Sequence, residues 1–227
     1  MRRRPGRHDV LARCVDDDPP AMSRAWRGRE PRSLPLFPLR TVLFPGGLLP
    51  LKVFEQRYVE MTKACMRDDA PFGVCLITQG EEVSTPDGAV PEFADVGTLA
   101  RITNFDMPQL GILHLQTQGL GRFNVQAHTV EDSGLVVGTV TAIAEEPHHP
   151  LADSYSPLVR VLELIAERLG AQNFPADAHY DDASWVGYRL AELLPLPLSI
   201  KQRMLEVNDA NVRLVALKQF LERQGIV

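Results

Sequence analysis

The sequence predicts an α+β protein in which a β-rich part precedes a helical part. Short apolar runs separated by turn residues fill positions 33–146, which is typical of several short strands. After Pro147 the apolar residues recur with a period near 3.6, the spacing of amphipathic helices. The chain has 227 residues, 44% of them hydrophobic and 23% charged, so it is long enough for a sizeable core in one or two domains.

Three parts are therefore expected: a basic tail over 1–32, a β-rich subdomain over 33–147 and an α-helical subdomain over 148–227. The tail carries nine arginines against five acidic residues and has no sustained apolar period. It can bury too little surface to offset its ordering entropy, so we predict disorder. Met22 is an alternative start, which leaves open whether residues 1–21 are translated.

The first strand is predicted at LPLFPL (34–39), whose prolines suit an edge strand or a strand start. Pro45-Gly46-Gly47 predicts a turn into a second strand, after which Phe54 is expected to enter the core. A helix over 55–66 follows, with its apolar residues on one face. The remaining strands are predicted at 72–78, 97–103, 110–118, 122–128 and 134–144. Strands at this spacing favour a closed or folded-over sheet.

Two connections in this region are predicted from turn residues. NFDMPQLG (104–111) is expected to be a longer loop that joins two strands as a hairpin. Gly119 and Gly121 are expected to make a tight turn before Arg122.

Four helices are predicted after Pro147, and their short links indicate a small bundle. The first ends at Gly170, and Asp181 or Asp182 caps the second. A third covers 199–206. The last is expected to open at Asn208 and to turn Val212, Val215, Ala216, Gln219 and Phe220 inward.

The common catalytic motifs are absent. None of the four lysines follows Gly or precedes Ser or Thr, so there is no P-loop, and GxGxxG, GxSxG and HExxH are also missing. His148-His149 and Glu145-Glu146 are interpreted as solvated charge in a linker rather than as a metal site or an acid–base pair. We therefore expect no enzyme activity, no metal and no cofactor, while a spatial Ser–Lys dyad stays open.

Charge and cysteine content limit the partners and the cellular location that we expect for the protein. Residues 33–227 carry 15 basic and 24 acidic side chains, a balance that opposes nucleic-acid binding. Cys14, Cys65 and Cys75 form no CxxC, which favours reduced thiols in a cytoplasmic protein. No apolar run approaches the roughly 20 residues that span a bilayer, so we expect no membrane partner.

The stretch LPLFPLRTVLFPGGLLPLKVFEQRYVEM (34–61) closely resembles the start of the N-terminal domain of Lon, the ATP-dependent protease. FGV at 72–74, GTLARI at 97–102 and Gly119-x-x-Arg122-Phe123 follow in the family's order. LPLPLSIKQRMLE and NVRLVALKQFLE resemble its helical part, so the similarity covers about 33–224.

The resemblance implies a PUA-like pseudo-barrel with one helix, followed by a helical bundle, in a domain associated with substrate recognition and assembly. The family's catalysis lies in other modules, so no catalytic residue carries over. We expect a non-catalytic module that binds unfolded polypeptide or a partner protein, with a protease as one candidate partner. An RNA-binding PUA-like protein and an undetected hydrolase are the alternatives, and the oligomeric state is open.

Two groups of apolar residues are candidates for peptide binding. Phe105, Met107 and Leu110 lie in the predicted 104–111 loop, and Leu48 and Leu49 adjoin the Gly46-Gly47 turn. Either group can form an exposed recognition patch. The alternative is that these side chains fold back onto the sheet as part of the core.

Overall fold

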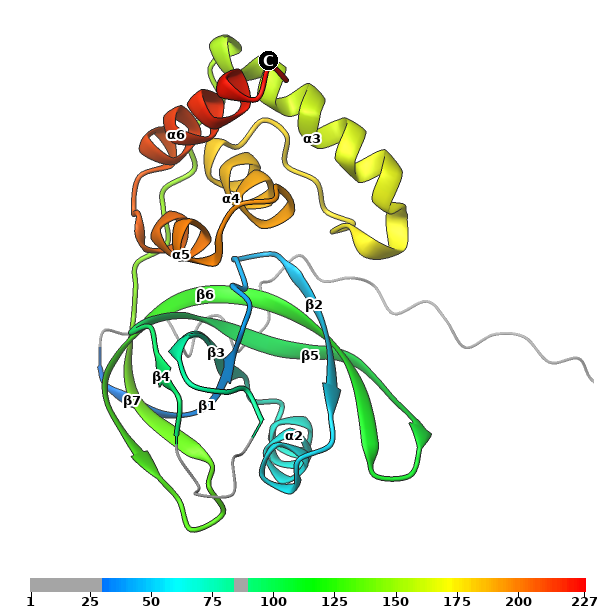
Figure 1. Cartoon of the computed structure of the whole chain (residues 1–227), viewed down its shortest axis with the longest axis vertical. Coiled ribbons are helices and arrows are strands. Elements are labelled where there is room, and N and C mark those ends of the chain that lie inside the picture. Colours follow the sequence, from blue (N-terminus) through cyan, green and yellow to red (C-terminus); the bar gives the residue numbers. More distant parts are fainter. Residues whose placement is uncertain (1–29, 84–89) are drawn as a thin grey trace, which may run out of the picture.

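The computed structural model describes residues 30–83 and 90–227 and shows a β-rich part followed by a helical part (Figure 1). The strands are β1 (Arg32–Leu39), β2 (Leu48–Val53), β3 (Phe72–Gln79), β4 (Glu92–Phe93), β5 (Val96–Gln109), β6 (Ile112–Val130) and β7 (Val136–Ala142). The helices are α2 (Gln56–Asp68), α3 (Ser156–Leu169), α4 (Ala183–Leu193), α5 (Leu198–Glu206) and α6 (Ala210–Arg223), with short 3₁₀ turns η1 (Asp153–Tyr155) and η2 (Ala171–Asn173). Most of the predicted tail, together with Cys14 and Met22, lies outside the described residues.

The sheet closes on itself, as the strand pattern predicted. Its strands follow the order β1-β7-β6-β5-β3, and β1 pairs again with β3 in parallel. β1 pairs with β7 as far as Leu36 and with β3 from Leu36 onward. Pro35 and Pro38 therefore lie in halves that are paired on one side only, where a missing N–H is tolerated. β1 joins the two ends of the sheet and is not a simple edge strand.

The helix α2 packs against this sheet through the face expected from the sequence. Tyr58, Met61 and Cys65 are buried. The Tyr58 ring stacks on Phe37 of β1 with centroids 3.9 Å apart. Glu55 and Arg57 at the start of the helix form an ion pair at 3.0 Å.

Gly119 and Gly121 do not form a turn, because β6 continues through both of them. A Cβ atom on Gly119 would lie 2.2 Å from the Phe44 carbonyl oxygen. The glycine instead lets the 44–47 turn approach β6, where the Gly46 N–H donates to the Gly119 carbonyl at 2.8 Å. Close backbone approach is a second common use of glycine.

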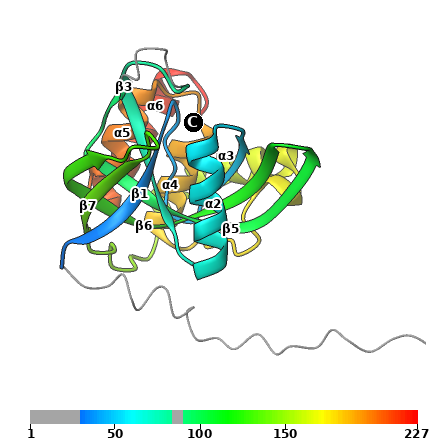
Figure 2. The same ribbon diagram turned by 90° about the horizontal axis from the view of Figure 1, so that it is seen from below.

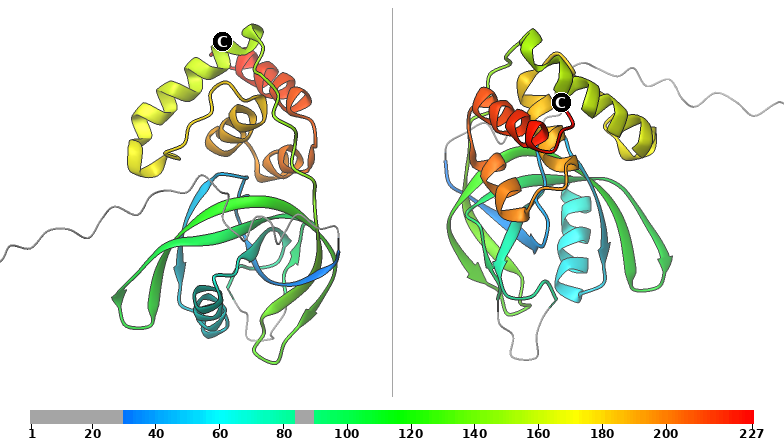
Figure 3. Two further views of the ribbon diagram at one scale, coloured as in Figure 1. Left: turned by 180° about the vertical axis from the view of Figure 1, so that it is seen from behind. Right: turned by 45° about the horizontal axis from the view of Figure 1, so that its top comes forward.

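The expected loop at 104–111 is mostly strand. β5 runs to Gln109 and β6 starts at Ile112, so Leu110 and Gly111 alone make the turn. Gly111 has a φ of +83°, which glycine adopts without strain. The resulting long hairpin extends sideways past α2, as the view from below and the two further views show (Figures 2 and 3).

The expectation that Phe54 enters the core is wrong, since its side chain is 55% exposed. Val53, the residue before it, is the buried one and ends β2 opposite Leu113.

The helical part has its own core, which also takes in side chains from the sheet. Val186, Leu190, Leu214 and Leu217 are fully buried there, and Phe44 packs among them. The Phe44 ring lies 5.8 Å from the Tyr188 ring of α4. Asp182 caps α4 by accepting from the Trp185 N–H at 2.9 Å, as predicted.

The prediction for the last helix is wrong in its cap and mostly wrong in its inner face, where Phe220 does pack against the core but Gln219 is exposed. Asp209, not Asn208, is the N-cap of α6. The buried residues are Ala210, Arg213, Leu214, Leu217 and Leu221, while Val212 and Val215 are exposed. Hydrophobicity did not identify the face because a charged residue, Arg213, lies in its centre.

Arg213 belongs to a buried ion cluster between the two parts. The Glu146 carboxylate accepts from the Arg213 guanidinium at 3.1 Å and from the Tyr188 hydroxyl at 2.7 Å. Arg122 of β6 lies 3.7 Å from the same carboxylate. We call Arg122, Glu146, Tyr188 and Arg213 the junction cluster. Its charged side chains are all buried.

The expectation of solvated charge at Glu145-Glu146 therefore holds for Glu145 and is wrong for Glu146. Burial raises the pKa of the Glu146 carboxyl, but hydrogen bonds from Arg213, Ser184 and Tyr188 outweigh burial and lower the pKa to about 2. The carboxylate is thus charged and fully partnered at neutral pH.

Further contacts tie the helices to the sheet at the same junction. Arg122 donates to the Leu205 carbonyl at 2.8 Å. Buried Arg189 of α4 donates to the Pro45 carbonyl at 2.7 Å. Gln202 of α5 donates to a backbone carbonyl at the start of β5 at 2.9 Å. These bonds fix the helical part on the sheet.

Candidate polypeptide-binding surface

A three-stranded extension of the sheet carries most of the candidate residues. It consists of β2, residues 113–118 of β6 and residues 101–109 of β5, and we call it the wing. The register places its residues in rows across the three strands. These rows are Pro50–Gln116–Asn104, Leu51–Leu115–Phe105 and Lys52–His114–Asp106.

The middle row shows which face of the wing is apolar. Leu115 is buried in the cluster that contains Tyr58 and Met61 of α2. Paired residues on neighbouring strands project to the same face, so Phe105 shares this face with Leu115. Met107 follows two residues later on β5, where the register with β6 shifts between Asp106 and Gln109. The hairpin extends past α2, and its apolar face emerges from the core there.

The structure places the hairpin candidates at the surface. Phe105 is 53% exposed, Met107 48% and Leu110, in the turn, 94%. About half of the Phe105 and Met107 side chains is thus open to solvent. Exposed apolar side chains gathered at one projecting end are typical of an interaction surface.

The second candidate pair lies in β2, the other outer strand of the wing. Leu49 is partly buried and packs against the core beneath the sheet, while Leu48 is partly exposed. Leu48 pairs with Gln118, at the end of β2 away from the hairpin turn. Leu48 and Leu49 therefore lie at the opposite end of the wing from Leu110 and the hairpin turn.

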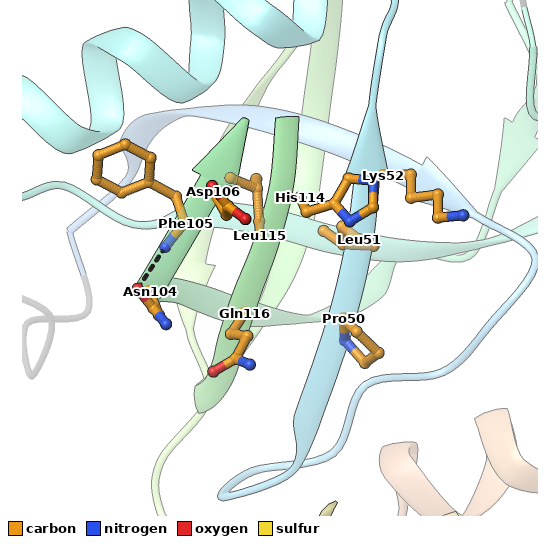
Figure 4. A pocket seen from close by; sticks show the side chains of 9 residues that line it. All are labelled: Pro50, Leu51, Lys52, Asn104, Phe105, Asp106, His114, Leu115 and Gln116. Carbon is orange, nitrogen blue, oxygen red and sulfur yellow. Dashed lines mark hydrogen bonds between the residues drawn. The ribbon is translucent and has the colours of Figure 1, made fainter. Parts of the chain in front are cut away.

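An open groove of about 670 Å³ runs across the wing and takes residues from all three rows, the apolar row included (Figure 4). Its lining residues are Pro50, Leu51, Lys52, Asn104, Phe105, Asp106, His114, Leu115 and Gln116. This groove was not predicted. The alternation of polar Asn104 and Asp106 with apolar Phe105 and Met107 was its available signal, because period-two alternation indicates a strand.

Two local hydrogen bonds form within β5, an outer strand of the wing. The Phe105 N–H donates to Asn104 Oδ1 at 2.9 Å, and the Met107 N–H donates to Asp106 Oδ1 at 2.7 Å (Figure 4 shows the first). Each polar side chain therefore satisfies the backbone donor of the apolar residue that follows it.

The described residues offer little reactive chemistry. Residues 30–83 and 90–227 contain no group of three or more His, Cys, Asp or Glu side chains that could hold a metal ion. Burial raises the pKa of Cys65 to about 11 and that of Cys75 to about 12, so both thiols stay protonated and weakly nucleophilic. Within the same residues no helix is both long and apolar enough to span a bilayer.

Comparison with solved structures identifies the fold class. A Lon N-terminal domain protein from Xanthomonas campestris superposes with a TM-score of 0.68 at 39% identity, covering 83% of this chain and 98% of that one. The N-terminal domain of Lon protease from the Mycobacterium avium complex superposes with a TM-score of 0.57 over 84% of this chain and 98% of that one. At 16% identity the second match shows the fold alone. The chain thus has the fold of a Lon N-terminal domain.

The family follows from the sequence comparison. The model of the ATP-dependent protease La (LON) substrate-binding domain matches residues 33–223, and the chain belongs to this family. Lon protease 2 of Myxococcus xanthus is 29% identical over 207 residues, which are 86% of this chain and 24% of that protein. Lon protease of Escherichia coli K12 is 28% identical over 201 residues, 84% and 25% respectively. The chain spans about a quarter of the length of these relatives.

Proposed function

We propose that this protein is a non-catalytic recognition module that binds unfolded polypeptide segments through the exposed apolar end of the wing. The exposure of Phe105, Met107 and Leu110 on a projecting hairpin carries the proposal. The family's description as a substrate-binding domain of a protease supports polypeptide as the ligand. Delivery of the bound segment to a protease is a corresponding role, and the two free buried thiols, Cys65 and Cys75, support a cytoplasmic location.

The wing suits this role physically. The hairpin is anchored in the sheet by the 14-residue β5 and the 19-residue β6, so its apolar side chains are presented on a rigid element. A preformed surface loses less entropy on binding than a flexible loop. Each large apolar side chain that becomes fully buried contributes about 1.5–3 kcal/mol.

A binding titration with matched variants tests the proposal. The probe is a fluorescently labelled, permanently unfolded polypeptide, followed by anisotropy. We compare Phe105→Ser with Met107→Ser in one variant against a control that combines Val212→Ser and Val215→Ser. The control residues are 55% and 45% exposed on α6, outside the wing.

The wing variant is expected to bind roughly tenfold more weakly or worse, because about 1.4 kcal/mol of lost contact corresponds to tenfold. The control is expected to bind like the wild type. Equal affinity of both variants and the wild type would contradict the proposed site. A loss in both variants to the same degree would show that the polypeptide adheres to any apolar surface.

A further inference from the structure

The wing has two strand edges without a neighbouring strand among the described residues. There, β2 pairs with β6 alone. β5 pairs with β3 only through Thr98–Ala100, so its continuation to Gln109 has β6 on one side and no strand on the other. Free edges usually present N–H and C=O groups that can accept an added strand.

The register shows which backbone groups of β2 face outward. The Gly119 N–H donates to the Gly47 carbonyl at 2.8 Å, which fixes the alternation of the β2–β6 pairs. The backbone N–H and C=O groups of Leu49 and Leu51 are then directed at β6. The backbone groups of Leu48, Pro50 and Lys52 point to the free edge. Pro50 has no N–H, so the centre of this edge lacks a donor.

The same alternation applies to β5. The backbone of Leu115 is hydrogen-bonded to β2. The backbone groups of its neighbours His114 and Gln116 are therefore directed at their β5 partners Asp106 and Asn104. The residue between those partners, Phe105, therefore directs its N–H to the free edge.

This edge donor is already occupied. The N–H groups of Phe105 and Met107 donate to the side chains of Asn104 and Asp106, at 2.9 and 2.7 Å. An incoming strand would have to displace both side chains before it could form its first bonds with β5.

We propose that the wing disfavours strand addition, because Asn104 and Asp106 occupy two edge donors of β5 and Pro50 removes the central donor of β2, and we call this its closure. This inference rests on the proposed function and specifies its mode. The unfolded polypeptide is held through apolar side-chain contacts with Phe105, Met107 and Leu110, and does not become another strand of the sheet.

The closure has a clear physical benefit. An apolar hairpin with open edges is a template for edge-to-edge pairing with a second copy. Occupied donors on β5 allow Phe105 and Met107 to stay exposed for recognition while pairing between copies is disfavoured.

The test compares the mass of three variants with that of the wild type by sedimentation from low to high micromolar concentration. The open-edge variant combines Asn104→Ala and Asp106→Ala. The exchange variant combines Asn104→Asp and Asp106→Asn, which keeps both acceptor oxygens and the net charge. The control combines Asn211→Ala and Asp177→Ala, two exposed residues of the same types outside the wing.

We expect the open-edge variant alone to associate, with a doubling of its mean mass relative to the wild type as concentration rises. The exchange variant and the control are expected to follow the wild type. An open-edge variant that keeps the wild-type mass throughout, or an exchange variant that associates equally, would overturn the closure.

A second arm separates strand pairing from apolar adhesion. Phe105→Ser and Met107→Ser are added to the open-edge variant, which should still associate because backbone groups form the new contact. Loss of association would overturn the closure in favour of side-chain adhesion. Failure of the proposed function gives a different result, namely unchanged polypeptide binding when the same two substitutions are made in the wild type.

Discussion

The junction cluster and the wing reverse the usual distribution of charged and apolar side chains in opposite ways. At the junction, the charged side chains of Arg122, Glu146 and Arg213 are buried and partnered across the two parts of the molecule. In the wing, the apolar side chains of Phe105 and Met107 are exposed and contribute little to the core. Charge lies inside at one place and hydrophobicity outside at the other.

The two regions differ in how much a substitution there should destabilise the fold. Removing one member of a buried ion cluster leaves the other charge without its partner, which costs much. Removing an exposed apolar side chain returns little surface to water, so it costs little. The junction is therefore the rigid support, and the wing is free to interact.

The largest effect is expected from Arg213→Ala at the junction. It leaves the Glu146 carboxylate buried without its bidentate partner, and the free energy of unfolding should fall by about 3–5 kcal/mol. Urea unfolding followed by circular dichroism measures this change. Arg160→Ala on the exposed side of α3 is the control, expected within about 0.5 kcal/mol of the wild type. Equal stability of the two variants would contradict a stabilising role for the junction cluster.

The stability that the junction cluster contributes is expected to depend on pH in the acid range. The folded pKa of Glu146 is about 2, below its ordinary value of 4.5, so its charged form stabilises the fold above the ordinary value. This contribution is lost as the pH falls from about 4.5 through about 2. The stability difference between the wild type and Glu146→Gln should therefore shrink over this range, measured by urea unfolding at each pH. A difference that is constant with pH would contradict a charged Glu146.

A smaller loss is expected where the 44–47 turn meets β6. Gly119→Ala places a Cβ against the Phe44 carbonyl, and the overpacking should cost about 1–3 kcal/mol. Gly121→Ala is the matched control in the same strand, since no atom lies within 4 Å of its added Cβ. Thermal unfolding compares the two, and an equal change in both would contradict the close approach.

The smallest effect on stability is expected in the wing. Phe105→Ser with Met107→Ser should lower the free energy of unfolding by about 1 kcal/mol or less, because about half of each side chain is already exposed. Urea unfolding of the variant used for the binding titration provides this value. A loss of several kcal/mol would show that the two residues belong to the core.

The sequence predicted the parts of this molecule that depend on periodicity. The strands, α2 with its buried Tyr58 and Met61, and the helical part all have an apolar repeat that local packing preserves. It failed at Arg213 and Glu146, whose burial depends on partners 67 residues apart. A pattern read from neighbouring residues cannot identify a partner so distant in the sequence.

The candidate site shows the same limit. Phe105, Met107 and Leu110 were predicted as candidates because apolar residues stood among turn-forming ones, although the segment is a strand up to Gln109. Asn, Asp and Pro indicated a loop, and the edge-capping role of Asn104 and Asp106 needs a register that only the fold supplies. The groove formed with Lys52 of β2 needs the same long-range pairing.

Photo-crosslinking from the hairpin turn tests whether the wing contacts the unfolded polypeptide. A benzophenone amino acid replaces Leu110 at the hairpin turn or, in the control, Leu164 on α3, which is also exposed. Each protein is irradiated with the unfolded polypeptide, and the crosslinked fraction is measured by mass spectrometry. We expect efficient crosslinking from position 110 and little from position 164. Equal yields from both positions, or a higher yield from position 164, would contradict recognition by the wing.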